Sequence, residues 1–118
     1  MEGDPMTPDV KVYLLDQNGE RIFGEGPYRL LAGVEATGSL RRSAQEMGMA
    51  YTKAIRLVRR AEEALGFPLT CPTTGGKSGG GSTLTPRGKE LLRRYEAYRD
   101  ACHEANRRIY GEIFGDTL

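Results

Sequence analysis

The sequence predicts a mainly α-helical fold that carries small β-hairpins. Apolar residues recur every three or four positions in successive segments between residues 27 and 65, which is the period of an amphipathic helix. A glycine-rich stretch, TTGGKSGGG at 73–81, separates two short strand-like segments, and a further helical pattern follows. With 118 residues, 38% hydrophobic and 28% charged, the chain has the size and composition of one globular domain.

The N-terminal part predicts a hairpin after a short tail. Residues 1–9, MEGDPMTPD, are expected to form a flexible N-terminus, and their acidic character is unlike that of a signal peptide. No apolar run approaches the roughly 20 residues of a membrane span, so we expect a cytoplasmic protein with no membrane partner. Residues 10–15, VKVYLL, alternate as a strand does, and Asn18-Gly19 suits a tight hairpin turn. Arg21 to Phe23 then returns as a second strand or as an extended lead-in.

Three helices are predicted next. The first covers residues 27–36, with Pro27 at its first position and Gly38 as its C-terminal cap. Ser39 caps a second helix that runs to about Met47, and Gly48 breaks it. The third covers residues 50–65 and ends at Gly66, and its inward side is Ala54, Ile55, Val58, Ala61 and Leu65. Two short helices joined at a glycine predict a helix-turn-helix.

The glycine-rich stretch predicts a wing. Residues 68–71 and 82–84 are expected to be short strands, and the stretch between them holds five glycines and Lys77. A glycine-rich hairpin directly after the third helix is where a winged helix-turn-helix places its wing. The predicted winged helix-turn-helix unit spans residues 10–85, and the fold class is this unit with a long C-terminal helix.

The last helix is predicted to mediate dimerisation. Thr85 and Pro86 start it, and its pattern continues to about Tyr110, a length of nearly 40 Å at 1.5 Å per residue. A helix of some 25 residues is longer than so small a domain can cover, so part of its apolar stripe is expected to meet a second copy. Residues 86–118 are therefore the dimerisation helix and tail. The predicted interface residues are Leu91, Tyr95, Tyr98, Cys102, Ala105 and Ile109.

Charge along the chain predicts a polyanion-binding face. The net charge is +1, but residues 1–40 carry −4, residues 41–94 carry +7 and the remainder carries −2. Basic residues that gather on one region indicate nucleic acid as a partner, whereas a solvated charged surface is the alternative. We expect double-stranded DNA.

Candidate DNA-binding residues come from the second and third helices and the wing. Residues near the start of a recognition helix reach base edges, and those farther along contact phosphates. Arg41 and Arg42 open the second helix, where its N-terminus favours a phosphate. Lys77 would be a cation at the tip of the wing. The predicted DNA-binding residues are Ser39, Arg41, Arg42, Tyr51, Thr52, Lys53, Arg56, Arg59, Arg60 and Lys77.

Enzymatic and metal-binding functions are not indicated. A phosphate-binding loop around Gly76-Lys77-Ser78 would need a glycine where Cys71 stands and a helix where three glycines follow. The only histidine is His103, and the two cysteines, Cys71 and Cys102, are expected to be free thiols. We therefore expect no catalytic residues, no metal and no cofactor.

The same residues resemble the DNA-binding domain of the ModE family of molybdate-responsive transcriptional regulators, itself related to LysR-type regulators. The resemblance runs from about Phe23 to Tyr98, over GEGPYRLLAGVEATGSLRRSAQEMGMAYTKAIRLV and TGGKSGGGSTLTPRGKELL. A TGGxxGGG wing followed by LT, a glycine and a leucine pair is distinctive of that family. The resemblance implies a homodimer on an inverted-repeat operator, with residues 50–65 in the major groove and the wing beside them. It also implies that the N-terminal strand region and the first and last helices build the dimer interface.

Departures from the family pattern limit what the resemblance implies. Ala50 stands where the family has serine, a lost cap of on the order of 1 kcal/mol, and Ile55 stands where it has tryptophan. Full-length members also carry C-terminal oxyanion-binding domains, which residues 86–118 leave no room for. We expect no molybdate-binding module here. Constitutive repression, response to a separate effector-sensing protein and an effector site within this chain remain three alternatives.

The leading hypothesis is a sequence-specific transcriptional regulator, with molybdenum- or tungsten-related genes as its candidate targets. One alternative is a winged-helix protein-interaction module, or a non-specific DNA-binding protein, without its own effector site. Another is a small-anion-binding protein that uses the glycine-rich loop. The cations between Arg41 and Arg60 favour the leading hypothesis, because an interaction module has no reason to retain them.

Overall fold

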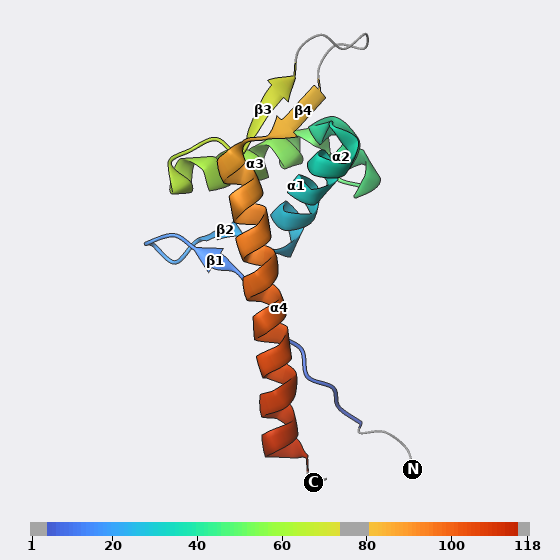
Figure 1. Cartoon of the computed structure of the whole chain (residues 1–118), viewed down its shortest axis with the longest axis vertical. Helices are drawn as coiled ribbons and strands as arrows, with labels where there is room; N and C mark the ends of the chain where they lie inside the picture. Colours follow the sequence, from blue (N-terminus) through green and yellow to red (C-terminus); the bar gives the residue numbers. More distant parts are fainter. Residues whose placement is uncertain (1–4, 74–80, 116–118) are drawn as a thin grey trace.

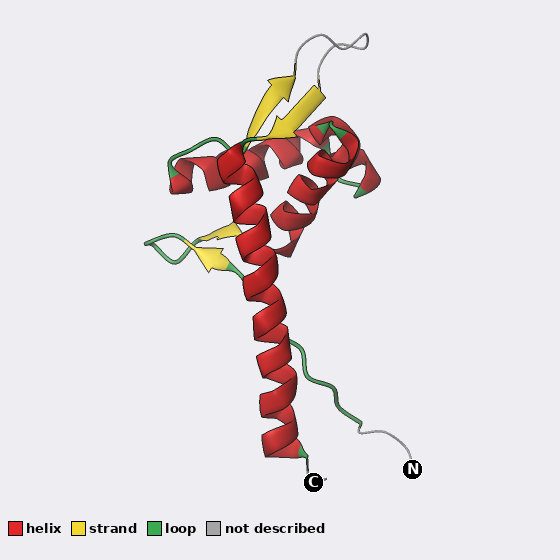
Figure 2. Ribbon diagram, viewed as in Figure 1, coloured by secondary structure: helices red, strands yellow, loops and turns green. Residues whose placement is uncertain are grey.

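The computed structural model describes residues 5–73 and 81–115, and within them it has the predicted winged helix-turn-helix architecture (Figures 1 and 2). Two small antiparallel hairpins accompany four helices, and the last helix is by far the longest. The elements in chain order are β1 (Leu14–Leu15), β2 (Arg21–Phe23), α1 (Glu25–Thr37), α2 (Leu40–Glu46), α3 (Tyr51–Leu65), β3 (Thr70–Thr73), β4 (Gly81–Leu84) and α4 (Pro86–Phe114).

The turn of the first hairpin differs from the predicted two-residue turn. The Gly19 N–H donates to the Asp16 carbonyl (3.0 Å), and the Asp16 N–H donates to the Glu20 carbonyl (2.8 Å). Gly19 has φ 80°, whereas Asn18 keeps a negative φ. The loop therefore has three residues, a type I turn followed by a glycine in the left-handed region. The Asp16 carboxylate closes it from within by accepting the N–H groups of Asn18 (2.8 Å) and Glu20 (3.0 Å).

The caps of α1 and α2 follow the sequence. Gly38 ends α1 with φ 75°, as predicted, and the Ser39 hydroxyl accepts the Arg42 N–H (3.0 Å) at the start of α2. Helix α1 begins two residues earlier than expected, at Glu25, so Pro27 occupies its third position rather than its first. A proline is tolerated there because the first-turn N–H groups have no partner within the helix.

Helices α1 and α2 meet at a contact that only glycine permits. A Cβ atom on Gly33 would lie 2.0 Å from the Ser43 hydroxyl oxygen. Ser43 is buried, and its hydroxyl donates to the Leu30 carbonyl of α1 (2.7 Å). This close approach fixes how α2 packs against α1, and α3 follows α2 in the chain.

The core lies where the four helices meet the bases of the two hairpins. Phe23 and Tyr95 pack edge to face, with ring centroids 5.1 Å apart. Ile55 and Leu65, predicted to be inward, are half-buried at the margin of this core. The buried apolar residues are Ile22, Phe23, Leu30, Leu31, Val34, Leu40, Ala44, Ala54, Val58, Ala61, Leu69, Leu84, Leu92 and Tyr95.

The second hairpin is tied to the helix-turn-helix at its base. Strands β3 and β4 pair from Thr70 opposite Leu84 to Thr73 opposite Gly81. The first of these strands was predicted at residues 68–71, so it begins and ends two residues later than expected. The Ser82 N–H donates to the carbonyl of Gly38, the residue between α1 and α2 (2.8 Å). Figure 1 shows this hairpin standing beside α3, as the wing of such a unit does.

Helix α4 extends far beyond the core. Its buried residues are Gly88, Leu92 and Tyr95, so none of its residues from 96 to 114 is buried. Residues 5–12 run alongside this projecting part (Figure 1). Because residues 10–13 follow α4 instead of pairing with β2, the predicted strand at 10–15 is reduced to Leu14–Leu15. Among the described residues, no helix combines the length and the apolarity that crossing a membrane requires.

Candidate nucleic-acid interface

Helix α3 presents its predicted recognition residues outward. Ala54, Val58 and Ala61 are its buried residues and fix which side of the helix faces the core. Thr52 and Lys53 are exposed in its first turn, as the position of a recognition helix requires. Arg56 and Arg59 are exposed further along and, with Thr52, Ile55, Arg60 and Glu63, line one shallow depression on the outer face.

Three cations on α3 differ from the arginines of α4 in having no acidic partner among the described residues. Within residues 5–73 and 81–115, no ion pair joins Lys53, Arg56 or Arg59 to a carboxylate, whereas every arginine of α4 lies within 4.0 Å of one. A polyanion could therefore approach these three side chains of α3 without first breaking an internal ion pair.

Arg60 is the exception, because it has acidic partners within the chain, and its DNA contact stays a prediction. Its guanidinium turns toward the first hairpin, where it donates to the Glu20 carboxylate (2.5 Å) and the Arg21 carbonyl (3.0 Å). The Asp16 carboxylate lies 3.8 Å away. The pKa of Asp16 is lowered, mainly because its carboxylate accepts the Glu20 N–H, with smaller contributions from the Asn18 N–H and Arg60. Arg60 thus holds the hairpin against α3, although its side chain also lines the edge of the outer depression.

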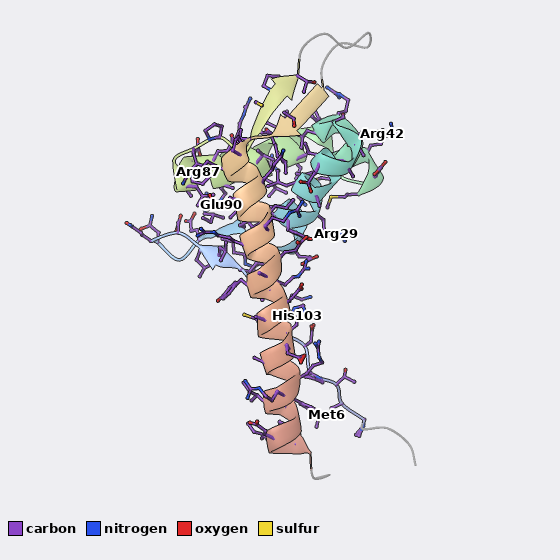
Figure 3. The ribbon with its side chains drawn as sticks, in the orientation of Figure 1. Met6, Arg29, Arg42, Arg87, Glu90 and His103 are labelled. Atoms are coloured by element: carbon purple, nitrogen blue, oxygen red, sulfur yellow. The ribbon has the colours of Figure 1, made fainter. Side chains whose placement is uncertain are left out.

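The predicted residues of α2 are divided in their roles. The Ser39 hydroxyl oxygen is engaged as the cap of α2. Arg42 is exposed on α2 (Figure 3) and lies 3.6 Å from Glu46 in an exposed ion pair one helical turn away. Arg41 is also exposed, but its guanidinium carbon lies 4.0 Å from the centroid of the Tyr51 ring.

A groove separates α3 from the base of the wing. Tyr51, Ile55 and Arg59 line it from α3, and Thr70, Pro72 and Ser82 line it from the strands. Among the described residues that line the groove, the strands contribute no charged side chain, and α3 contributes the cation Arg59 and the carboxylate Glu62. Lys77, the predicted wing-tip cation, lies outside the described residues.

Support for the wing comes from residues that sequence reasoning missed. The Glu62 carboxylate accepts the Leu69 N–H (2.7 Å) and so joins the end of α3 to the start of β3. The Thr85 hydroxyl donates to the Pro68 carbonyl (2.8 Å) while it caps α4 by accepting the Gly88 N–H (2.9 Å). A glutamate on the third helix carries no signal of its own in the sequence, whereas Thr85 was recognised only as a cap.

The residues of the predicted dimer stripe on α4 fall into three groups by exposure. Tyr95 is 2% exposed and packs in the core of its own chain, so its assignment to the interface is corrected. Its hydroxyl donates to the Val12 carbonyl (2.8 Å), and burial raises the pKa of this phenol. Tyr98 and Ile109 are 54% and 45% exposed. The other three, Leu91, Cys102 and Ala105, are half-buried.

Three side chains of α4 hold the N-terminal segment, and two of them were not identified from the sequence. Tyr110 donates to the Met6 carbonyl (3.2 Å), and Nε2 of His103 lies 3.1 Å from the Val10 carbonyl. Tyr95 completes the series, and Met6 and His103 are marked on this part of the molecule in Figure 3. The described part of the predicted flexible tail, residues 5–9, therefore lies along α4. The only sequence signal for this contact is the spacing of Tyr95, His103 and Tyr110 by seven or eight residues, which repeats along one helix face.

The described residues contain no cluster of three or more histidines, cysteines or acids placed to hold a metal ion. Cys71 on the wing is exposed, Cys102 on α4 is half-buried, and both are free thiols.

Comparison with known proteins connects this geometry to bacterial regulators. The chain is 37% identical over 84 residues to the molybdenum-pterin-binding protein MopB of Rhodobacter capsulatus, which covers 71% of this chain and 31% of that protein. It is 40% identical over 81 residues to the molybdenum transport protein ModE of Herbaspirillum seropedicae, covering 69% of this chain and 27% of that protein. The chain thus spans about a third of the length of these relatives.

A solved structure and a family profile agree with these relatives. The fold matches the crystal structure of the BenM DNA-binding domain with benA site 1 DNA, with a TM-score of 0.51 and 21% identity, covering 71% of this chain and 92% of that one. The family of bacterial regulatory helix-turn-helix proteins of the lysR type matches residues 28–89, from α1 through the wing to the first turn of α4. This match spans more than half of the chain, and the chain belongs to that family.

Proposed function

We propose that this chain is a sequence-specific DNA-binding transcriptional regulator that places α3 in the major groove. The observation that carries the proposal is the outward face of α3, where Lys53, Arg56 and Arg59 are exposed beside the wing without an ion-pair partner among the described residues. Arginine and lysine side chains at such positions contact guanine edges and phosphates. The family match and the DNA complex of the BenM domain agree with this use of the fold. Its DNA target would place the protein in the bacterial cytoplasm.

We further propose that the protein acts as a homodimer held by α4. An ideal helix advances about 100° per residue, so Leu91, Tyr98, Cys102, Ala105 and Ile109 fall on one face. The residues that hold the N-terminal segment fall on the neighbouring face, and Tyr98 and Ile109 of the stripe stay exposed. A 29-residue helix is about 43 Å long, and no residue of its projecting part is fully buried within its own chain. A second copy of α4 would cover this stripe, and a two-fold axis would match an inverted repeat.

Selection of genomic fragments on the purified protein tests the DNA-binding function. Fragments retained at near-physiological salt would be sequenced, and enrichment of an inverted repeat is expected. Retention without a shared motif, lost steeply as salt rises, would reduce the function to phosphate attraction. Retention of no fragment would favour an interaction module instead.

Substitution of single cations tests the role of α3. Arg56→Ala is expected to weaken operator binding by about 1–3 kcal/mol if Arg56 contacts a base. Lys89→Ala is the matched control, because Lys89 is also an exposed cation without an ion pair in the described ranges but lies on α4. An equal effect of the two substitutions would contradict the assignment of α3 as the recognition helix.

Self-association tests the dimer. Ile109→Glu places a carboxylate on the stripe, and sedimentation velocity is expected to show more monomer at a given concentration. Arg107→Glu places the same group on the same turn but away from the stripe, and it should leave association unchanged. A wild-type chain that sediments as a monomer at micromolar concentration would refute the proposal.

The relatives suggest which genes are regulated. Proteins named for molybdenum binding or transport lead us to propose molybdenum- or tungsten-related genes as targets, with a separate effector-sensing protein as a further partner. The genes beside the enriched fragments test the first part. Targets without any link to these metals would overturn it without affecting DNA binding.

A further inference from the structure

Arg41 and Tyr51 form a contact that joins the two helices of the DNA-binding corner. The guanidinium carbon of Arg41 lies 4.0 Å from the centroid of the Tyr51 ring. Arg41 is the second residue of α2 and Tyr51 is the first of α3, so the contact bridges the turn between them. No ion pair engages Arg41 within the described ranges, whereas its neighbour Arg42 lies 3.6 Å from Glu46.

The side chains of Tyr51 and Arg41 differ in conformational freedom, and this difference decides which of them positions the other. Tyr51 is half-buried and packs against the core, so its ring is held by the fold. Arg41 is exposed, and an arginine side chain loses much rotamer entropy when it is fixed. The ring is therefore the platform and the arginine is the group that it orients.

A guanidinium that stacks by its face keeps its hydrogen-bond donors available. The five N–H groups of arginine lie in the plane of the group, and the plane matches the geometry of a phosphate. With its guanidinium carbon 4.0 Å from the ring centroid, Arg41 is close enough to stack on Tyr51 by its face, an arrangement that leaves this donor edge unoccupied. A lysine at the same place would keep the charge but has no plane to stack.

We propose that Tyr51 is a positioning residue for Arg41, and that the stacked pair binds one phosphate of the DNA backbone as a single unit. This inference rests on the proposed DNA-binding function and assigns Tyr51 a role other than the base contact expected from its place in α3. It also separates Arg41 from Arg42, which the sequence treats alike.

A comparison of Arg41→Lys with Arg42→Lys tests the proposal on exposed residues whose replacement should not disturb folding. The probe is a duplex of random sequence, measured at several salt concentrations. Arg41→Lys is expected to weaken binding about two- to fivefold, the typical effect of a cation–π contact at an exposed site. The slope of log affinity against log salt should stay unchanged, because a cation still meets the phosphate. Arg42→Lys keeps a cation near the phosphates and removes no contact with an aromatic ring, so it should weaken binding less than Arg41→Lys and also leave the slope unchanged.

A double-substitution cycle tests the coupling directly. In a Tyr51→Phe background, which keeps the ring, Arg41→Lys should cost as much as in the wild type. In a Tyr51→Leu background, which removes the ring, it should cost nothing further, and Arg41→Gln should still lower the salt slope by about 0.9. Thermal melting tests whether the Tyr51→Leu variant is folded. If it is not, the coupling of Arg41 to Tyr51 is decided by comparing Arg41→Lys with Arg42→Lys and by measuring Arg41→Lys in the Tyr51→Phe background.

The outcomes separate this inference from the proposed function. Equal effects of Arg41→Lys and Arg42→Lys, or an Arg41→Lys effect that persists in a folded Tyr51→Leu variant, would overturn the coupling while DNA binding stands. Failure of the wild-type protein to bind any duplex would overturn both.

Discussion

The close approach of α1 and α2 at Gly33 predicts a loss of stability when any side chain is added there. In the substitution Gly33→Ala, the new Cβ atom would lie 2.0 Å from the Ser43 hydroxyl oxygen and 2.8 Å from the Ser43 Cβ atom. Both distances are shorter than any van der Waals contact, so either the helices separate or the Ser43 side chain moves.

Each response has a cost that can be compared with the benefit of alanine. Separation of packed helices costs about 1–3 kcal/mol. Movement of Ser43 breaks its hydrogen bond to the buried Leu30 carbonyl, and an unsatisfied buried hydroxyl also costs about 1–3 kcal/mol. Alanine returns about 1 kcal/mol through its higher helix propensity. The difference is about 0–2 kcal/mol, and we expect a net loss near the middle of this range, about 1 kcal/mol.

Urea unfolding followed by circular dichroism measures this change. Gly26→Ala is the matched control, because Gly26 lies in the same helix and an added Cβ would meet nothing within 4 Å. That variant should gain up to about 1 kcal/mol, so the same substitution has opposite signs at two positions of α1. Both are compared at one protein concentration, since the proposed dimerisation would make stability depend on it. A Gly33→Ala protein as stable as the wild type would refute the packing argument.

Three further outcomes follow from contacts described above. Arg60→Ala should loosen the first hairpin, which would be measured as faster amide hydrogen exchange there, and it should leave the salt dependence of DNA binding unchanged. Arg59→Ala should instead lower the slope of log affinity against log salt by about 0.9 and leave the amide exchange unchanged. Because folding lowers its pKa, Asp16 should stabilise the hairpin fully at pH values above the ordinary carboxyl pKa of about 4. This stabilisation should be lost as the pH falls through the lowered pKa, and NMR titration of the wild type and of Asp16→Asn would follow the loss. Gly88→Ala should destabilise more than Gly33→Ala in the same urea assay, because its Cβ would lie 2.2 Å from the Leu69 carbonyl, a backbone atom that cannot rotate away.

The architecture was predictable because local signals and the global fold agree. Glycines at 38 and 66 end their helices, as predicted, and Ser39 caps α2, as predicted. Periodicity identified the buried face of α3, because apolar side chains at steps of three and four can lie only on one side of a helix.

The site was less predictable, since the partners of a charged side chain depend on tertiary contacts. Arg59 and Arg60 are adjacent arginines in the sequence, yet only the second reaches Glu20 across the fold. Periodicity likewise placed Tyr95 on the dimer stripe. A core contact with Phe23, which is distant in sequence, removes it from that surface.

The hold of α4 on the N-terminal segment has a consequence for how this family member can vary. Tyr95, His103 and Tyr110 reach only the carbonyl oxygens of Val12, Val10 and Met6. Every amino acid, proline included, carries that oxygen. These three hydrogen bonds therefore depend on the path of the backbone, whereas the packing of half-buried Val10 and Val12 still favours apolar side chains at those two positions. The exposed positions of the segment are free to vary while the three residues of α4 are constrained. Among orthologues, an alignment should show more variation in the exposed residues of the N-terminal segment than at the three α4 positions that bind it.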